Sequence, residues 1–257
     1  MVGVLTTLVY WFIGVVATLL GSMSGLGGGF LSVPLLYYIG VSMPIAVATS
    51  KFMVFINSII STYRYIEKIK LPLNLYIAVV VPMIITAYLG AFLVAILPVN
   101  ILSTIIGLIL FVSALRMLLQ RNNTGRSTSQ KQGLSMYIQG AFSGALAGFV
   151  AGISGLGGGV VNVPVFIYIL GLDPHLAVSL SMACIIPSSI SSVIRHIIDG
   201  LIDWSIGIPL SIGALIGGWI GPRIALRMKK EKLVKIIGGV MIIATLRIII
   251  ESIIKLL

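Results

Sequence analysis

The run SGLGGG occupies residues 24–29 and recurs at residues 154–159, each time between two apolar blocks. Three consecutive glycines are poor in a continuous helix, because each costs about 1 kcal/mol relative to alanine. A Val-Pro pair follows each run, at residues 33–34 and 163–164, and this pattern favours a new helix start. The sequence therefore predicts two broken helices, with new helices beginning near Ser32 and Asn162.

The similarity between the two regions extends well beyond the glycine runs. Equivalent positions farther along the chain include Pro44 and Pro174, Arg64 and Arg195, Gly107 and Gly238, and Arg116 and Arg247. Residues 120–133 are polar and basic, which is typical of a solvated linker. We therefore expect two tandem copies of one unit, at residues 1–119 and 134–257, joined by a linker at residues 120–133.

The composition indicates an integral membrane protein. The 257 residues are 58% hydrophobic and only 9% charged, and the first charged side chain is Lys51. Eight apolar blocks are long enough to cross a bilayer, and two are too short to span it alone. The long blocks lie near residues 4–24, 45–63, 73–96, 101–119, 134–154, 176–198, 204–226 and 233–254, and the short ones near 30–42 and 160–171. This predicts an all-α, multi-pass protein of the cell membrane.

The net charge of +11 is divided into short clusters between apolar blocks, which favours membrane orientation over nucleic-acid binding. Equivalent loops of the two copies differ in sign, as expected if the copies are inserted upside down relative to each other. Basic loops at residues 64–70, 116–131 and 227–235 then lie in the cytoplasm, while residues 97–101 and 195–203 lie outside. Both termini are expected to face outward.

Inverted repeats with helices broken at mid-membrane are a recurrent plan of secondary transporters. A helix N-terminus offers free amides and a partial positive charge, and glycines let an anion approach the backbone closely. We therefore expect the two breaks to meet near the membrane centre, with helix N-termini facing one another around a small anion. The expected backbone ligands are Ser24, Gly25, Gly27, Gly28 and Gly29 in the first copy, and Ser154, Gly155, Gly157, Gly158 and Gly159 in the second.

Polar side chains near the breaks are candidates for the same site. Lys51 lies within an apolar run, where a charge is costly and usually functional, so it is either the counter-charge to the anion or an interfacial residue. Each hydroxyl taken alone more often bonds to its own helix, but a cluster of them is a better candidate. The predicted partners are Ser32, Thr49, Ser50, Asn57, Asn162, Ser179 and Ser181.

The paired Gly-rich segments, each followed by a proline, resemble those of the TauE/SafE family of sulfite exporters and toluene-sulfonate uptake permeases. This resemblance spans nearly the whole chain and implies transport of sulfite, a sulfonate or a related organosulfur compound. No cofactor, metal or disulfide is expected, because Cys184 is the single cysteine and the loops around His175 and His196 are expected to be solvated. The coupling ion, proton or Na⁺, and a possible homodimer remain open.

Two other functions compete with a carrier. A passive anion channel could use the same opposed helix ends and basic mouths. Ser154 within the sequence GISG could be the nucleophile of an intramembrane serine protease with His196 as its base. Against the protease, Tyr65 stands in the first copy where His196 stands in the second.

Overall fold

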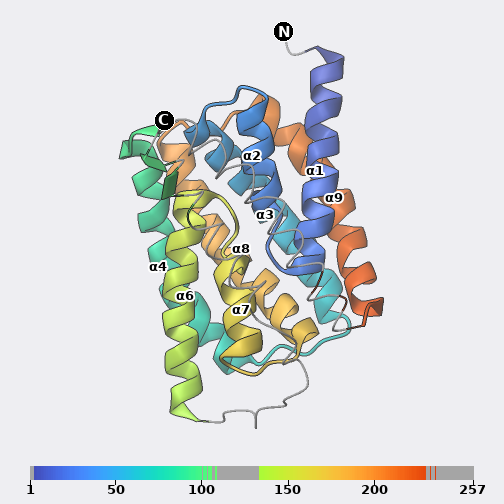
Figure 1. The fold of residues 1–257 in the computed structure, drawn as a ribbon, viewed down its shortest axis with the longest axis vertical. Helices are drawn as coiled ribbons and strands as arrows, with labels where there is room; N and C mark the ends of the chain where they lie inside the picture. Colours follow the sequence, from blue (N-terminus) through green and yellow to red (C-terminus); the bar gives the residue numbers. More distant parts are fainter. Residues whose placement is uncertain are drawn as a thin grey trace.

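The computed structural model describes residues 3–99 and 133–229, with a few further residues between 101 and 108 and at 232 and 235. This part of the chain is helical throughout (Figure 1). Six helices are long and apolar enough to cross a membrane, which confirms the predicted all-α, multi-pass membrane protein. They are α1 (Val4–Ser24), α3 (Met43–Ile66), α4 (Leu73–Ile96), α6 (Leu134–Ser154), α8 (Pro174–Ile198) and α9 (Trp204–Arg227), and the two short helices are α2 (Gly29–Tyr38) and α7 (Gly159–Tyr168). The predicted linker and most of the blocks at residues 101–119 and 233–254 lie outside the described residues.

Both Gly-rich runs break the helix, as predicted, but the new helices begin earlier than expected. Gly25 and Gly28 adopt left-handed backbone angles, with φ of 75° and 104°, and α2 follows directly at Gly29. The second copy is the same, so Pro34 and Pro164 lie inside α2 and α7 rather than at their starts. Glycines that accept positive φ let the chain turn within three residues, so no proline is needed to begin the helix.

Each short helix turns back beside the long helix before it, so the predicted short segments are re-entrant. In Figure 1, α1 and α6 start from opposite ends of the molecule, and α2 and α7 return toward those ends. The predicted cytoplasmic loops that the structure describes share one end of the bundle, since the residues around Arg64 line a cavity with Arg227. Gly133, next to the linker, lies beside Pro72 at that same end.

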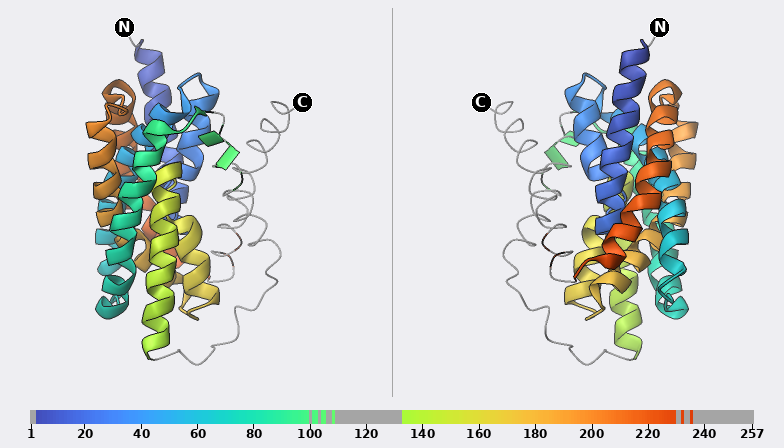
Figure 2. Two further views of the ribbon diagram at one scale, coloured as in Figure 1. Left: turned by 90° about the vertical axis from the view of Figure 1, so that its left-hand side faces the viewer. Right: turned by 90° about the vertical axis from the view of Figure 1, so that its right-hand side faces the viewer.

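Helices from different repeats form the closest pairs, α1 with α9 and α4 with α6 (Figure 2). Glycines bring the backbones together, because any side chain at Gly14 would strike the carbonyl of Leu210, and one at Gly152 would strike that of Ala87. Gly90 and Gly217 also lie close to neighbouring helices, α6 and α1 respectively. The face formed by Gly213, Gly217 and Gly221 is likewise used within the chain, against α1.

The central helices are α3 and α8, which are buried more than the other four spans. Large apolar side chains of α1, α4 and α9 point outward, among them Phe12, Ile85 and Ile212. Such a surface suits contact with lipid chains. The core of the bundle is therefore formed by α3 and α8 together with the two buried breaks.

Candidate functional site

The two glycine runs meet in the centre of the molecule, as predicted. A side chain on Gly29 would overlap the carbonyl oxygen of Gly155, and one on Gly159 would overlap that of Gly25. A Cβ on Gly157 would lie 2.6 Å from the carbonyl oxygen of Leu26. Residues 24–30 and 154–160 are all buried. The crossing is thus closed by backbone packed on backbone.

The start of each short helix has amides without acceptors in its own helix. In α2, the first amides to bond within the helix are those of Leu31 and Ser32, both to the carbonyl of Gly28, and α7 repeats this pattern from Gly158. The preceding amides are the free donors that favour an anion.

The expectation that two N-termini face one another is wrong in detail. Each start faces the C-terminal carbonyls of the other copy's long helix, since Gly29 lies on Gly155 and Gly159 on Gly25. The partial negative charge of a helix C-terminus opposes the positive end beside it. The backbone alone is therefore a weaker anion site than expected, and an anion bound there would need a cation beside it.

Lys51 is such a cation, and it is fully buried in α3. Its Nζ donates to the carbonyl oxygen of Ala151 at 3.1 Å, in the last turn of α6 before the second break. Both ion pairs among the described residues involve other side chains, so none neutralises Lys51. Next to it, the buried hydroxyl of Ser50 has no hydrogen-bond partner in this structure. Lys51 is therefore not exposed on the surface of the bundle, and its role as the counter-charge to an anion stays a prediction.

Asn57 binds the first break directly. Its Nδ2 donates to the carbonyl oxygen of Gly27 at 2.8 Å, and its Oδ1 accepts from Ser22 and Ser61 at 2.8 and 3.1 Å. Tyr65 completes the group, because its hydroxyl donates to the carbonyl oxygen of Ser22 at 2.8 Å. Ser22, Ser61 and Tyr65 were not predicted, although the polar residues at 57, 61 and 65 recur at i, i+4 and i+8 on an apolar helix, which places them on one face.

Among the other predicted side chains, Ser181 binds the break of the opposite copy, donating to the carbonyl oxygen of Gly25 at 2.8 Å. Several hydroxyls bond to carbonyls of their own helices instead, which is the commoner role. These are Ser24, Ser32, Ser154 and Ser179. Asn162 accepts from Ser143, and Thr49 accepts from the amide of Asp203 near one end of the bundle. The structure gives these six residues other partners than a shared ligand.

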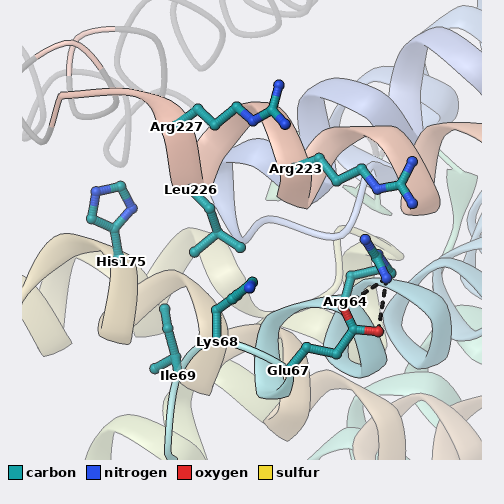
Figure 3. Close-up of a pocket in the computed structure, with 8 residues that line it drawn as sticks. All are labelled: Arg64, Glu67, Lys68, Ile69, His175, Arg223, Leu226 and Arg227. Carbon is teal, nitrogen blue, oxygen red and sulfur yellow. Dashed lines mark hydrogen bonds and ion pairs between the residues drawn. The ribbon is translucent and has the colours of Figure 1, made fainter.

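A basic cavity of about 470 Å³ opens at the predicted cytoplasmic end, between α3, α8 and α9 (Figure 3). Its lining includes four cationic side chains and one acidic side chain, Glu67. Glu67 is already paired with Arg64, whose guanidinium also stacks on Trp219 at 4.4 Å. Figure 3 shows Arg223 and Arg227 above the cavity and Lys68 and His175 beside it. This opening favours entry of anions over cations.

The opposite end carries Arg195, which is bound by two hydrogen bonds to Asp199, at 2.9 and 2.6 Å, and stacks on Phe92. These contacts hold the guanidinium at the bundle surface, as expected for a residue that snorkels.

His196, the next residue along the chain, does not lie where the sequence predicts. His196 is not in a solvated loop but in α8, fully buried, and neither ring nitrogen has a hydrogen-bond partner in this structure.

The protease arrangement is not formed in this structure. The Ser154 hydroxyl donates to the carbonyl oxygen of Val150 and accepts from the amide of Leu156, while the His196 ring has no hydrogen bond. A nucleophilic serine needs its base within hydrogen-bond reach.

The fold and the site define a multi-spanning membrane protein with paired broken helices, the plan of secondary transporters. The chain belongs to the TauE/SafE family, because the family model described as "Sulfite exporter TauE/SafE" matches residues 10–248.

Two relatives carry the description "probable membrane transporter protein". One, from Methanocaldococcus jannaschii, is 32% identical over 160 residues, which cover 60% of this chain and 58% of the relative. The other, YunE of Bacillus subtilis, is 26% identical over 204 residues, covering 70% of this chain and 74% of the relative. The match to the first relative thus spans less than two thirds of its length. No solved structure shows significant similarity to the chain.

Proposed function

We propose that the chain is a secondary transporter for a small oxyanion, sulfite or a sulfonate, which binds where the two breaks cross. The observation that carries this proposal is Lys51, a fully buried cation that contacts α6 one turn before the second break. A buried charge in a membrane protein is costly unless a partner neutralises it. An oxyanion is the partner that fits a site lined by free amides, a hydroxyl and an ammonium group.

The class of substrate follows from the family description, which names sulfite export. A trigonal or tetrahedral sulfur oxyanion presents several acceptor oxygens, each able to take one of the donors near the crossing. The basic cavity at the end near Arg64 would concentrate such anions before they reach the crossing. Direction of transport is set by the gradient of the anion and of whatever ion accompanies it.

A carrier is favoured over a permanently open channel by the burial of both breaks. Access must then alternate between the two ends around the crossing. Helix α1 packs on α9, and α6 packs on α4, through glycine contacts, so each pair joins one helix from each copy. We expect each pair to move as one rigid body. We propose that the α1–α9 and α4–α6 pairs move relative to the α3–α8 core.

The test is uptake of sulfite, sulfate and methanesulfonate into proteoliposomes by the parent and by Lys51→Met. Methionine occupies the equivalent position, residue 182, in the second copy, so this change suits the local packing. The matched control is Lys70→Met, which removes the same charge from an exposed loop. We expect saturable uptake by the parent and the control, and at least a tenfold loss in Lys51→Met.

Each alternative gives a different result in this assay. Uptake that rises linearly with concentration and shows no counterflow would indicate a channel. Full activity of folded Lys51→Met would refute the role given to Lys51, and absence of any anion flux in the folded parent would refute oxyanion transport itself. Counterflow, in which internal anion accelerates uptake, would support alternating access.

A further inference from the structure

The central helices α3 and α8 carry matched polar stripes whose last members differ. The stripe on α3 is Asn57, Ser61 and Tyr65, and the equivalent stripe on α8 is Ser188, Ser192 and His196. Every member of the first stripe has a hydrogen-bond partner within the core. In the second stripe both serines bond to backbone carbonyls, but the imidazole has no partner.

An imidazole without a partner is unusual at a fully buried position. Leaving a buried polar group unsatisfied costs about 1–3 kcal/mol. The equivalent tyrosine avoids this cost by bonding to the carbonyl of Ser22, and Gly152 replaces Ser22 in the second copy. An apolar residue would fill this position equally well if packing were its role. His196 is therefore a candidate proton-binding group whose imidazole is protonated in another state of the transporter.

The charges around His196 define what could stabilise that proton. Ala48 of α3 and Val193 of α8, each three residues before Lys51 and His196, pack together in one buried cluster, so the ammonium and the imidazole belong to adjacent turns of these helices. Arg195, next to His196 in α8, is paired with Asp199. Helices α1, α4, α6 and α7 contribute no charged residue to this region, and Asp203 is bonded to Ser205 at the start of α9. No carboxylate among the described residues therefore balances both Lys51 and a protonated His196.

Charge balance then selects the ligand. A singly charged anion bound beside Lys51 gives a neutral site, whereas a doubly charged anion gives a site with one uncompensated negative charge. Protonation of His196 would neutralise that remaining charge. Because a buried site disfavours net charge, the dianion and the proton should each raise the affinity for the other by the same factor.

We propose that Lys51 and His196 together bind a doubly charged oxyanion, such as sulfite in its dianionic form, with one proton on His196. This inference rests on the proposed function and narrows it to a dianion and proton carried together. The imidazole gains one N–H bond when it takes a proton from water on one side, and this bond breaks again when the proton is released to water on the other. Sulfonates, which carry one charge, are poorer ligands of this pair.

The first test measures proton movement with anion movement in proteoliposomes, using sulfate as a dianion and methanesulfonate as a monoanion. We expect about one proton to accompany each sulfate ion in the parent, and none in His196→Gln or His196→Tyr. The tyrosine variant copies the first stripe and is chosen to preserve folding. His175→Gln removes the other histidine, and we expect it to keep the proton ratio of the parent whatever its rate.

The second test observes the imidazole itself in protein labelled with ¹⁵N-histidine, in the His175→Gln background, where His196 is the single histidine. We expect the ring to be neutral near pH 7 without anion and to become an imidazolium when sulfate or sulfite is added. Methanesulfonate should leave it neutral.

The outcomes separate this inference from the proposed function. An unchanged proton ratio in both His196 variants, or an imidazole that stays neutral with dianion bound, overturns the dianion and proton site while oxyanion transport stands. A folded parent that neither binds nor carries any of the three anions overturns both.

Discussion

Replacing Gly29 or Gly159 with alanine tests the crossing of the two breaks. Neither glycine has a positive φ, so alanine suits the backbone and the space alone decides the effect. The added Cβ would overlap a backbone carbonyl of the opposite copy, which cannot rotate away as a side chain can. Overpacking of this kind costs about 1–3 kcal/mol.

Gly207 provides a matched control within helix α9. A Cβ at Gly207 would lie 3.4 Å from the nearest atom, Cγ2 of Thr49, an ordinary contact. Alanine there should be neutral or should stabilise by up to about 1 kcal/mol through its helix propensity. The crossing variants and the control should therefore differ by about 1–4 kcal/mol. For a chain of this size, this corresponds to roughly 2–16 °C in Tm.

The assay is thermal unfolding of purified protein in mild detergent, followed by tryptophan fluorescence. The double variant Gly29→Ala with Gly159→Ala should cost less than the sum of the single changes, because both force the same two segments apart. If Gly29→Ala and Gly159→Ala unfold at the same temperature as Gly207→Ala, the close approach of the two runs is refuted.

Three further predictions follow from other parts of the structure. Asn57→Ala should lower the unfolding free energy by about 1–3 kcal/mol, because it removes the hydrogen-bond partners of buried polar groups. The hydroxyl of Ser58 bonds to its own helix, so the control Ser58→Ala should change this free energy by less than half as much in the same thermal assay. Lys68→Cys should react with a membrane-impermeant maleimide only from the cytoplasmic side, and Ser205→Cys only from outside. Labelling of both cysteines from one side in intact cells would contradict the inverted arrangement. Arg227→Gln should weaken the apparent affinity for sulfite about two- to tenfold at low salt and much less at 0.5 M salt, as measured by initial uptake rates, whereas an effect independent of salt would argue against an electrostatic role of the basic cavity.

Much of the fold follows from patterns in the sequence. Length and apolarity located the six described spans to within a few residues, because a bilayer imposes both requirements on a helix. The repeated glycine run predicted both breaks. The opposite charges of equivalent loops predicted that the two copies run in opposite directions. The Val-Pro pairs predict helix starts that are too late, because the left-handed glycines complete the turn before Pro34 and Pro164.

The site was predicted less completely, because its partners come from distant segments. Nothing local to Ser22 shows that Tyr65 and Asn57 will bond to that part of α1. The burial of His196 was missed for a related reason. The charged residues on either side of it, Arg195 and Asp199, suggested a solvated loop, but these two bond to each other on the outer face of α8 while the imidazole points inward.

The close pairing of α1 with α9 has a consequence for synthesis of the protein. The two helices are separated by residues 25–203, and translation adds about 5–20 residues per second, so α1 waits roughly 9–36 s before its partner begins to be made. During this time its glycine-lined face has no matching surface in the bilayer. We expect α1 to be a substrate for membrane-resident chaperones during this interval, and a chain truncated before Trp204 to remain open to proteolysis.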